Sequence, residues 1–251
     1  MKNEPEMSEN TRILRVMDYG RVPYHQAWAV QKRFQQERVS AKLSKLEPAK
    51  AFDDLLLFVE HPHVYTLGKS GDKSNMLISE ERLRQLEAEW VPIDRGGDIT
   101  YHGPGQIVGY PIIDLDHHFT DIHRYLRSLE EVIIRTCRYF GIESDRMEGL
   151  TGVWVEDRKI CAFGVKCSRW VTLHGFALNV STDLSYFTHI VPCGIQDKQV
   201  TSLEKELGTS LEMNEVKRVI AQQFEEVFTI KAIGFNPEWP ESSGEVARTA
   251  T

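Results

Sequence analysis

Residues 152–180, GVWVEDRKICAFGVKCSRWVTLHGFALNV, decide the fold. Three short runs rich in valine, isoleucine, phenylalanine and tryptophan lie within this stretch, and such β-branched and aromatic residues are typical of strands. Asp157 and Arg158 separate the first two runs, as the polar residues of a hairpin turn do. The stretch therefore predicts two or three strands that pair as antiparallel hairpins.

The chain on either side of these strands combines helical and strand patterns. Apolar residues recur at helical spacing within residues 23–45, and residues 55–59 form a short apolar run that a proline soon ends. The clearest helix is expected over residues 120–141, whose apolar face is formed by Ile122, Leu126, Leu129, Ile133 and Cys137. A last helix is expected over residues 212–229, and this combination predicts an α+β fold, a mixed β-sheet with flanking helices.

The composition of the chain indicates one compact domain. It has 251 residues, of which 41% are hydrophobic, and this is enough for a sizeable core. We expect a single domain over residues 13–235, with disordered ends at residues 1–12 and 236–251, where the sequence is polar.

Net charge and hydropathy argue against several kinds of partner. The formal charge of -7 disfavours broad binding to nucleic acid or to anionic membranes. No apolar run approaches the roughly 18 to 20 residues that a membrane-spanning helix needs, and the start of the chain resembles neither a secretory signal nor a transit peptide. We therefore expect a cytoplasmic protein that binds neither nucleic acid nor membrane.

The four cysteines, Cys137, Cys161, Cys167 and Cys193, contain no C-x-x-C pair, so thiols are expected in a reducing compartment. Most buried cysteines are unreactive small apolar residues, as expected for Cys137 on its helix face. Cys193 differs, because a proline precedes it and a glycine follows it. This pair predicts a defined turn that could display the thiol.

The segment RGGDITYHGPGQ, residues 95–106, holds four glycines between expected strands. Glycines let a backbone approach a ligand and present its N–H groups, which favours a binding loop, but a tight turn with a β-bulge explains the same pattern. The dinucleotide-binding fingerprint is absent, since Val108 stands where a third glycine is required. The GKS at residues 68–70 lacks the upstream glycine of a phosphate-binding loop, and no histidine spacing matches a zinc protease, so no metal site is expected.

Lys159 begins an otherwise apolar strand, so its side chain is expected at the strand edge or in a pocket. A cation beside a thiol favours the nucleophilic thiolate, and Lys159 next to Cys193 would therefore form an activated nucleophile. The residues alone do not bring the two together. A surface lysine whose stem covers apolar neighbours is the alternative.

Three segments together resemble one family, the lipoyl(octanoyl) transferases: residues 95–115, residues 152–180 and PCGI at residues 192–195. The similarity extends less sharply over residues 60–203. Members of this family move an octanoyl group from acyl carrier protein to a lysine of lipoyl domains. The resemblance implies a fold similar to the catalytic domain of lipoate and biotin protein ligases, and it implies neither a metal nor another cofactor.

By this resemblance, Cys193 is the nucleophile that forms an acyl thioester and Lys159 is its catalytic partner. A general base works best with a pKa near ambient pH, so we expect a depressed pKa for this lysine. The substrate-binding segments of the family correspond to Arg95, Gly96, Gly97, Asp98, Ile99, Thr100, Tyr101, His102, Ala162, Phe163, Gly164, Gly175, Phe176 and Ala177.

Three side chains, Tyr101, Phe163 and Leu178, are expected by position to line an apolar channel for the acyl chain. His102 is expected either to position substrate or to support its loop. Cys161 is close to Lys159 in sequence, but it is expected to be a packing residue.

The resemblance implies octanoyl-acyl carrier protein as donor. The implied acceptors are lipoyl domains of 2-oxoacid dehydrogenase complexes and the glycine cleavage H protein. A charge of -7 disfavours an acidic carrier, so we expect a local basic cluster formed by Lys159, Lys166, Arg169 and Arg95. An ATP-dependent lipoate or biotin ligase of the same fold is the alternative, followed by a non-catalytic binding protein and a cysteine hydrolase.

Overall fold

A computed structural model of the protein describes residues 12–44, 52–191 and 199–234. The strands are β1 (Ile13–Arg21), β2 (Asp54–Glu60), β3 (Val64–Leu67), β4 (Glu89–Pro92), β5 (Ile99–His102), β6 (Gln106–Ile112), β7 (Asp145–Met147), β8 (Leu150–Val155), β9 (Arg158–Ser168), β10 (Val171–Asn179), β11 (Gln199–Val200) and β12 (Lys231–Ile233). The α-helices are α1 (Tyr24–Ser44), α2 (Glu80–Gln85), α3 (Ile122–Tyr139), α4 (Leu203–Leu207) and α5 (Met213–Phe228). Short 3-10 helices are η1 (Lys73–Asn75), η2 (Leu115–His117) and η3 (Leu184–His189).

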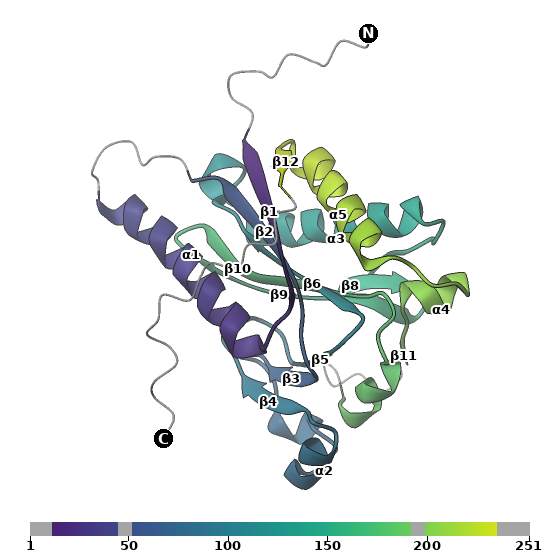
Figure 1. Cartoon of the computed structure of the whole chain (residues 1–251). Coiled ribbons are helices and arrows are strands. Elements are labelled where there is room, and N and C mark those ends of the chain that lie inside the picture. The colour runs from purple at the N-terminus through teal and green to yellow at the C-terminus, as the bar shows by residue number, and fades with distance from the viewer. Residues whose placement is uncertain (1–11, 45–51, 192–198, 235–251) are drawn as a thin grey trace.

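The large sheet has the strand order β12-β1-β2-β6-β10-β9-β8-β7, and β11 pairs with β9 beside this path. β1 runs parallel to β12 and β2, and β11 runs parallel to β9. The remaining pairs of this sheet are antiparallel, so the prediction of a mixed sheet is confirmed. A smaller sheet, in the order β4-β3-β5, lies with α2 at the bottom of Figure 1.

The stretch that decides the fold forms β8, β9 and β10 as two successive hairpins. The second hairpin turns at Arg169 and Trp170, which have φ values of 50° and 64°. Positive φ at both central residues gives a turn whose twist matches that of the flanking strands. The predicted antiparallel pairing is therefore confirmed.

Helices cover both faces of the large sheet (Figure 1). α1 packs Ala27, Val30 and Phe34 against apolar residues of β2, β6 and β10. α3 and α5 pack on the other face, where Leu129 and Phe224 belong to the largest apolar core. Cys137 is a fully buried member of that core, as predicted, and no described helix is long and apolar enough to cross a membrane.

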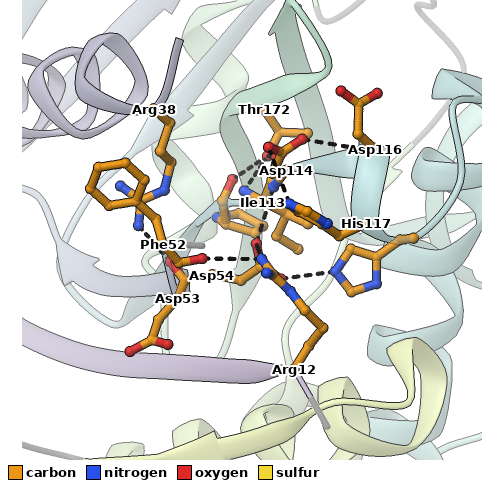
Figure 2. Close-up of polar contacts among 12 residues, drawn as sticks. Arg12, Arg38, Phe52, Asp53, Asp54, Ile113, Asp114, Asp116, His117 and Thr172 are labelled. Atoms are coloured by element: carbon orange, nitrogen blue, oxygen red, sulfur yellow. Dashed lines mark hydrogen bonds and ion pairs between the residues drawn. The ribbon is translucent and has the colours of Figure 1, made fainter. Parts of the chain in front are cut away.

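Arg12, the last residue of the N-terminal segment that was expected to be disordered, makes contacts with the start of β2. Its guanidinium donates to the Phe52 carbonyl at 3.1 Å and pairs with the buried Asp54 carboxylate at 3.3 Å (Figure 2). Asp54 also accepts from Nε2 of His118 at 2.8 Å and from the N–H of Asp114 at 3.0 Å. Residues 1–11 and the predicted disordered tail, 236–251, lie outside the described residues.

Candidate active site

A cavity of about 530 Å³ lies where β5, β6, β9 and β10 meet the loop at residues 95–98. This volume falls within the roughly 300 to 1,000 Å³ of small-molecule pockets. Tyr24 of α1 lines it from one layer of helices, and Ile122 and Leu126 of α3 line it from the other. Apolar and polar side chains therefore both line the cavity, and they come from the helices on both sides of the large sheet as well as from its strands.

The predicted substrate-binding segments converge on this cavity. All of their residues line it except Tyr101, and so does Lys159. Two of the segments meet because they are register partners in one hairpin: Gly164 pairs with Gly175, and Phe163 pairs with Phe176. Residues distant in sequence thus become neighbours through the pairing of β9 with β10.

Tyr101 does not line the cavity, because its side chain packs in an apolar cluster with Tyr65 of β3 and Tyr186 of η3. Its fully buried side chain stacks on Tyr186 of η3, with ring centroids 4.9 Å apart. Its hydroxyl lies 2.7 Å from Nδ1 of His63. Leu178 is likewise fully buried and does not line this cavity, whereas Phe163 does, and the acyl channel itself stays a prediction.

Arg95 explains part of the glycine pattern. Its buried guanidinium donates to the carbonyls of Thr66 and Gly96, each at 3.0 Å. A Cβ added to Gly164 would lie 2.6 Å from Cδ of Arg95, and one added to Gly68 would lie 2.2 Å from the Gly97 carbonyl oxygen. Because a Cβ on Gly68 would also lie 2.8 Å from Nη1 of Arg95, both glycines leave room for the buried arginine.

Two of the four side chains expected in the basic cluster, Arg95 and Lys166, do not present an unpaired charge at the surface. Arg95 is buried, and Nζ of Lys166 pairs with Asp94 at 2.6 Å. Asp94 also accepts from Nε2 of His174 at 2.8 Å. Burial alone would raise the Asp94 pKa, but the bonds from Lys166 and His174 outweigh burial and lower the pKa to about 2. The carboxylate of Asp94, which is distant from Lys166 in sequence, thus offsets the positive charge of that lysine.

Lys159 is the second residue of β9 and lines the cavity from a partly buried position. Its Nζ lies 4.6 Å from the centroid of the Trp154 ring, which is a cation–π distance. Val200 of β11 is the register partner of Lys159, and Gln199 and Val200 both line the cavity. Cys193, the predicted nucleophile, lies outside the described residues.

Two buried histidines, His102 and His174, line the cavity, and a third, His61, packs beside His102 with ring centroids 5.8 Å apart. Burial lowers the pKa of His61 and of His174 to about 4, and it holds the pKa of His102 well below its usual range. His102 donates from Nδ1 to Gln106 at 2.8 Å, and Gln106 donates to Asn179 at 2.9 Å. His102 therefore both lines the cavity and supports the strands around it, as a neutral side chain at pH 7.

The three described cysteines are poor nucleophiles. Burial raises the pKa of Cys137 to about 12, that of Cys161 well above its usual range, and that of Cys167 above its usual value. Each thiol is thus held in its protonated form, which is the unreactive one. Cys161 is almost fully buried, as expected of a packing residue.

Several cavity residues were not predicted from the sequence: Tyr24, Ile122, Leu126, Leu150, Trp154, His174 and Asn179. Ile122 and Leu126 continue the apolar face of α3, so their periodicity is the same as that of core residues. They differ from the core residues of α3 in that they lie in its first turns and are only partly buried. No sequence signal separates the others from ordinary strand and helix positions.

Comparison with known proteins identifies the family. Residues 23–225 match the family model of the lipoyl protein ligase A/B catalytic domain. The octanoyltransferase of Cytophaga hutchinsonii is 52% identical over 235 residues, which cover 89% of this chain and 96% of that protein. The chain belongs to the octanoyltransferase family. Another member, from Bacteroides fragilis, is 48% identical over 82% of this chain and 94% of its own length.

Solved structures of lipoate ligases share the fold of this octanoyltransferase family member. A lipoate-protein ligase A bound with ATP superposes with a TM-score of 0.69 at 15% identity, covering 91% of this chain and 89% of its own. The bi-partite lipoate protein ligase of Thermoplasma acidophilum gives 0.68 at 15% identity, covering 91% and 86%. At such identities the likeness concerns the fold alone, and it confirms the predicted fold class.

Proposed function

We propose that this octanoyltransferase works by two successive acyl transfers, with a thioester on Cys193 as intermediate and Lys159 as the proton-transferring side chain. The donor is octanoyl-acyl carrier protein. The acceptors are lysines of lipoyl domains in 2-oxoacid dehydrogenase complexes and of the glycine cleavage H protein. The three described cysteines are free thiols, which supports a reducing compartment, the cytoplasm, as the site of the reaction.

One observation supports this proposal most strongly. Lys159 lines a cavity of ligand size together with the segments that resemble the family's acyl-binding segments. β11, which follows the PCGI segment in the chain, pairs with β9 at Lys159 itself. The strand that follows the predicted nucleophile segment in sequence therefore pairs with the strand of the predicted catalytic lysine.

In the first half-reaction, the Cys193 thiolate attacks the thioester carbonyl of the donor. A carbon–sulfur bond to Cys193 forms while the one to the carrier breaks, and the carrier leaves as a thiol with the proton that Cys193 lost. In the second, the acceptor amine attacks the new thioester, a carbon–nitrogen bond forms and the Cys193 thiolate leaves. Lys159 as a neutral amine takes the proton from the attacking nitrogen.

The energetics of this sequence require no nucleotide. Thioester exchange is close to thermoneutral, and amide formation from a thioester runs downhill. The acyl chain is held by burial in the cavity, which is worth about 0.8 kcal/mol for each methylene. We assign the binding of the acyl chain to the lining residues within 95–102, 162–164 and 175–177. Tyr101 does not line the cavity but packs next to these residues in the interior.

The experiment compares two donors with one lipoyl-domain acceptor. With octanoyl-acyl carrier protein and no ATP, the mass of the acceptor should rise by one octanoyl group, whereas octanoate with ATP should leave it unchanged. The opposite result, with activity retained in Cys193→Ser, would identify an ATP-dependent ligase. Complex formation without any acyl transfer would identify a binding protein.

A further inference from the structure

Glu130 is a fully buried carboxylate on α3, outside the residues that line the cavity. Its Oε2 accepts from Nη1 of Arg127 at 2.7 Å and from Nε of Arg146 at 3.2 Å. Its Oε1 accepts from the N–H of Gly152 at 3.1 Å. Burying a carboxylate carries a large desolvation cost, so buried ion pairs are weak evidence of a purely stabilising role.

Glu130 is linked to the proposed catalytic lysine through a single residue, Gly152, which contacts both side chains. A Cβ added to Gly152 would lie 3.1 Å from Cε of Lys159 and 3.0 Å from Nε1 of Trp154. The stem of Lys159 therefore packs directly against the Gly152 backbone. Gly152 has a φ of 147°, a conformation that other residues rarely adopt, so a side chain at this position is disfavoured both by the backbone and by the nearby lysine stem.

The pairing of β8 with β9 is irregular at the same place. Val153 pairs with Cys161, but Trp154 pairs with Lys159, so β9 contributes one extra residue. Such bulges re-aim side chains near functional sites. Here the shift sets Trp154 opposite Lys159, with Nζ 4.6 Å from the ring centroid. Lys159 is thus held between Trp154 and Gly152.

We propose that Glu130 is a positioning residue for Lys159. Its Oε1 holds the Gly152 N–H, and this bond keeps β8 in the conformation that confines the lysine stem between Gly152 and Trp154. Arg127 and Arg146 hold the carboxylate in turn from the side of α3. The inference rests on the catalytic role that we propose for Lys159.

Two substitutions distinguish the effect of the side-chain length of Glu130 from the effect of its charge. Glu130→Asp keeps the charge for the arginines but shortens the side chain, so the Gly152 contact should be lost. We expect kcat to fall about tenfold with KM for octanoyl-acyl carrier protein within twofold, because a misplaced catalytic group can cost up to about 100-fold. Glu130→Gln keeps an oxygen within reach of Gly152, and kcat should fall only about twofold.

Glu131→Asp is the matched control. Glu131 is the next residue of the same helix, and its carboxylate also pairs with Arg146, at 2.9 Å. Unlike Glu130, it is partly exposed and does not bond to Gly152. Its kcat should stay within twofold of the parent value. An equal loss of kcat in Glu131→Asp and Glu130→Asp would contradict the proposal, because it would show a general effect of the arginine cluster.

A second readout does not depend on octanoyl transfer. In protein with ¹³Cε-labelled lysine, the Lys159 signal, assigned through Lys159→Arg, should move toward that of an exposed lysine in Glu130→Asp but not in Glu131→Asp. If Glu130→Asp does not fold, Glu130→Gln should show a smaller shift in the same direction. A Lys159 signal that does not move in Glu130→Asp would overturn the inference. If the signal moves but the parent protein does not transfer octanoyl groups, only the proposed function would be overturned.

Discussion

Lys159→Met should lower kcat for octanoyl transfer about a thousandfold while the protein stays folded. Methionine keeps an unbranched stem against Gly152 and Trp154, but it removes the amine that takes the proton from the acceptor lysine. General acid–base catalysis typically contributes about 100- to 10,000-fold. Single-turnover transfer from the preformed acyl-enzyme to a lipoyl domain measures this step directly.

Lys166→Met provides the control for that experiment. Lys166 lies on the same strand, but its Nζ pairs with Asp94 and its side chain is not part of the cavity lining. We expect at most a few-fold change in kcat. Transfer by Lys159→Met at a rate close to that of Lys166→Met would contradict the role of Lys159 in proton transfer.

Acid should destabilise the protein steeply between pH 6.5 and pH 4. Burial lowers the pKa of His61 and His174 to about 4 and that of His102 well below its usual range, whereas histidines in the unfolded chain titrate near 6.5. Within this window the unfolded chain binds protons that the folded protein does not, so stability is complete above pH 6.5 and falls as the pH is lowered. One proton is worth about 1.4 kcal/mol per pH unit, so His61 and His174 together contribute about 2 to 3 kcal/mol per pH unit near pH 5, and His102 acts in the same direction.

Urea unfolding at a series of pH values measures this slope. His61→Gln should reduce proton uptake on unfolding by about one, because His61 binds the Val22 carbonyl and the Tyr110 hydroxyl as a neutral ring. His123→Gln, at an exposed position of α3, should leave the slope unchanged. A slope near pH 5 that is the same in all three proteins would show that the buried histidines are not the cause.

Local patterns in the sequence predicted the elements that build the cavity. The hairpins of residues 152–180 and the helices follow from residue type, spacing and turn signals, which act over a few neighbours. The convergence of the two glycine-containing segments followed from the family resemblance. Its physical basis is the register that pairs Gly164 with Gly175, and register depends on the whole sheet.

The errors in the sequence prediction arise from contacts between distant residues. The charge of Lys166 in the expected basic cluster is paired with Asp94, which lies 72 positions away in the chain. Tyr101 was assigned to the cavity because its neighbours in sequence lie there, but its side chain stacks on the distant Tyr186 of η3. The burial of Glu130 could not be predicted, because a single glutamate in an amphipathic helix is ordinarily solvent-exposed.

The most direct test of the account is the intact mass of the protein after incubation with octanoyl-acyl carrier protein and no acceptor. We predict one octanoyl adduct that maps to Cys193, is released by hydroxylamine and is absent in Cys193→Ser. An adduct on another residue, or its persistence in Cys193→Ser, would contradict the thioester mechanism. Octanoyl transfer to a lipoyl domain at the normal rate by Cys193→Ser would contradict it as well.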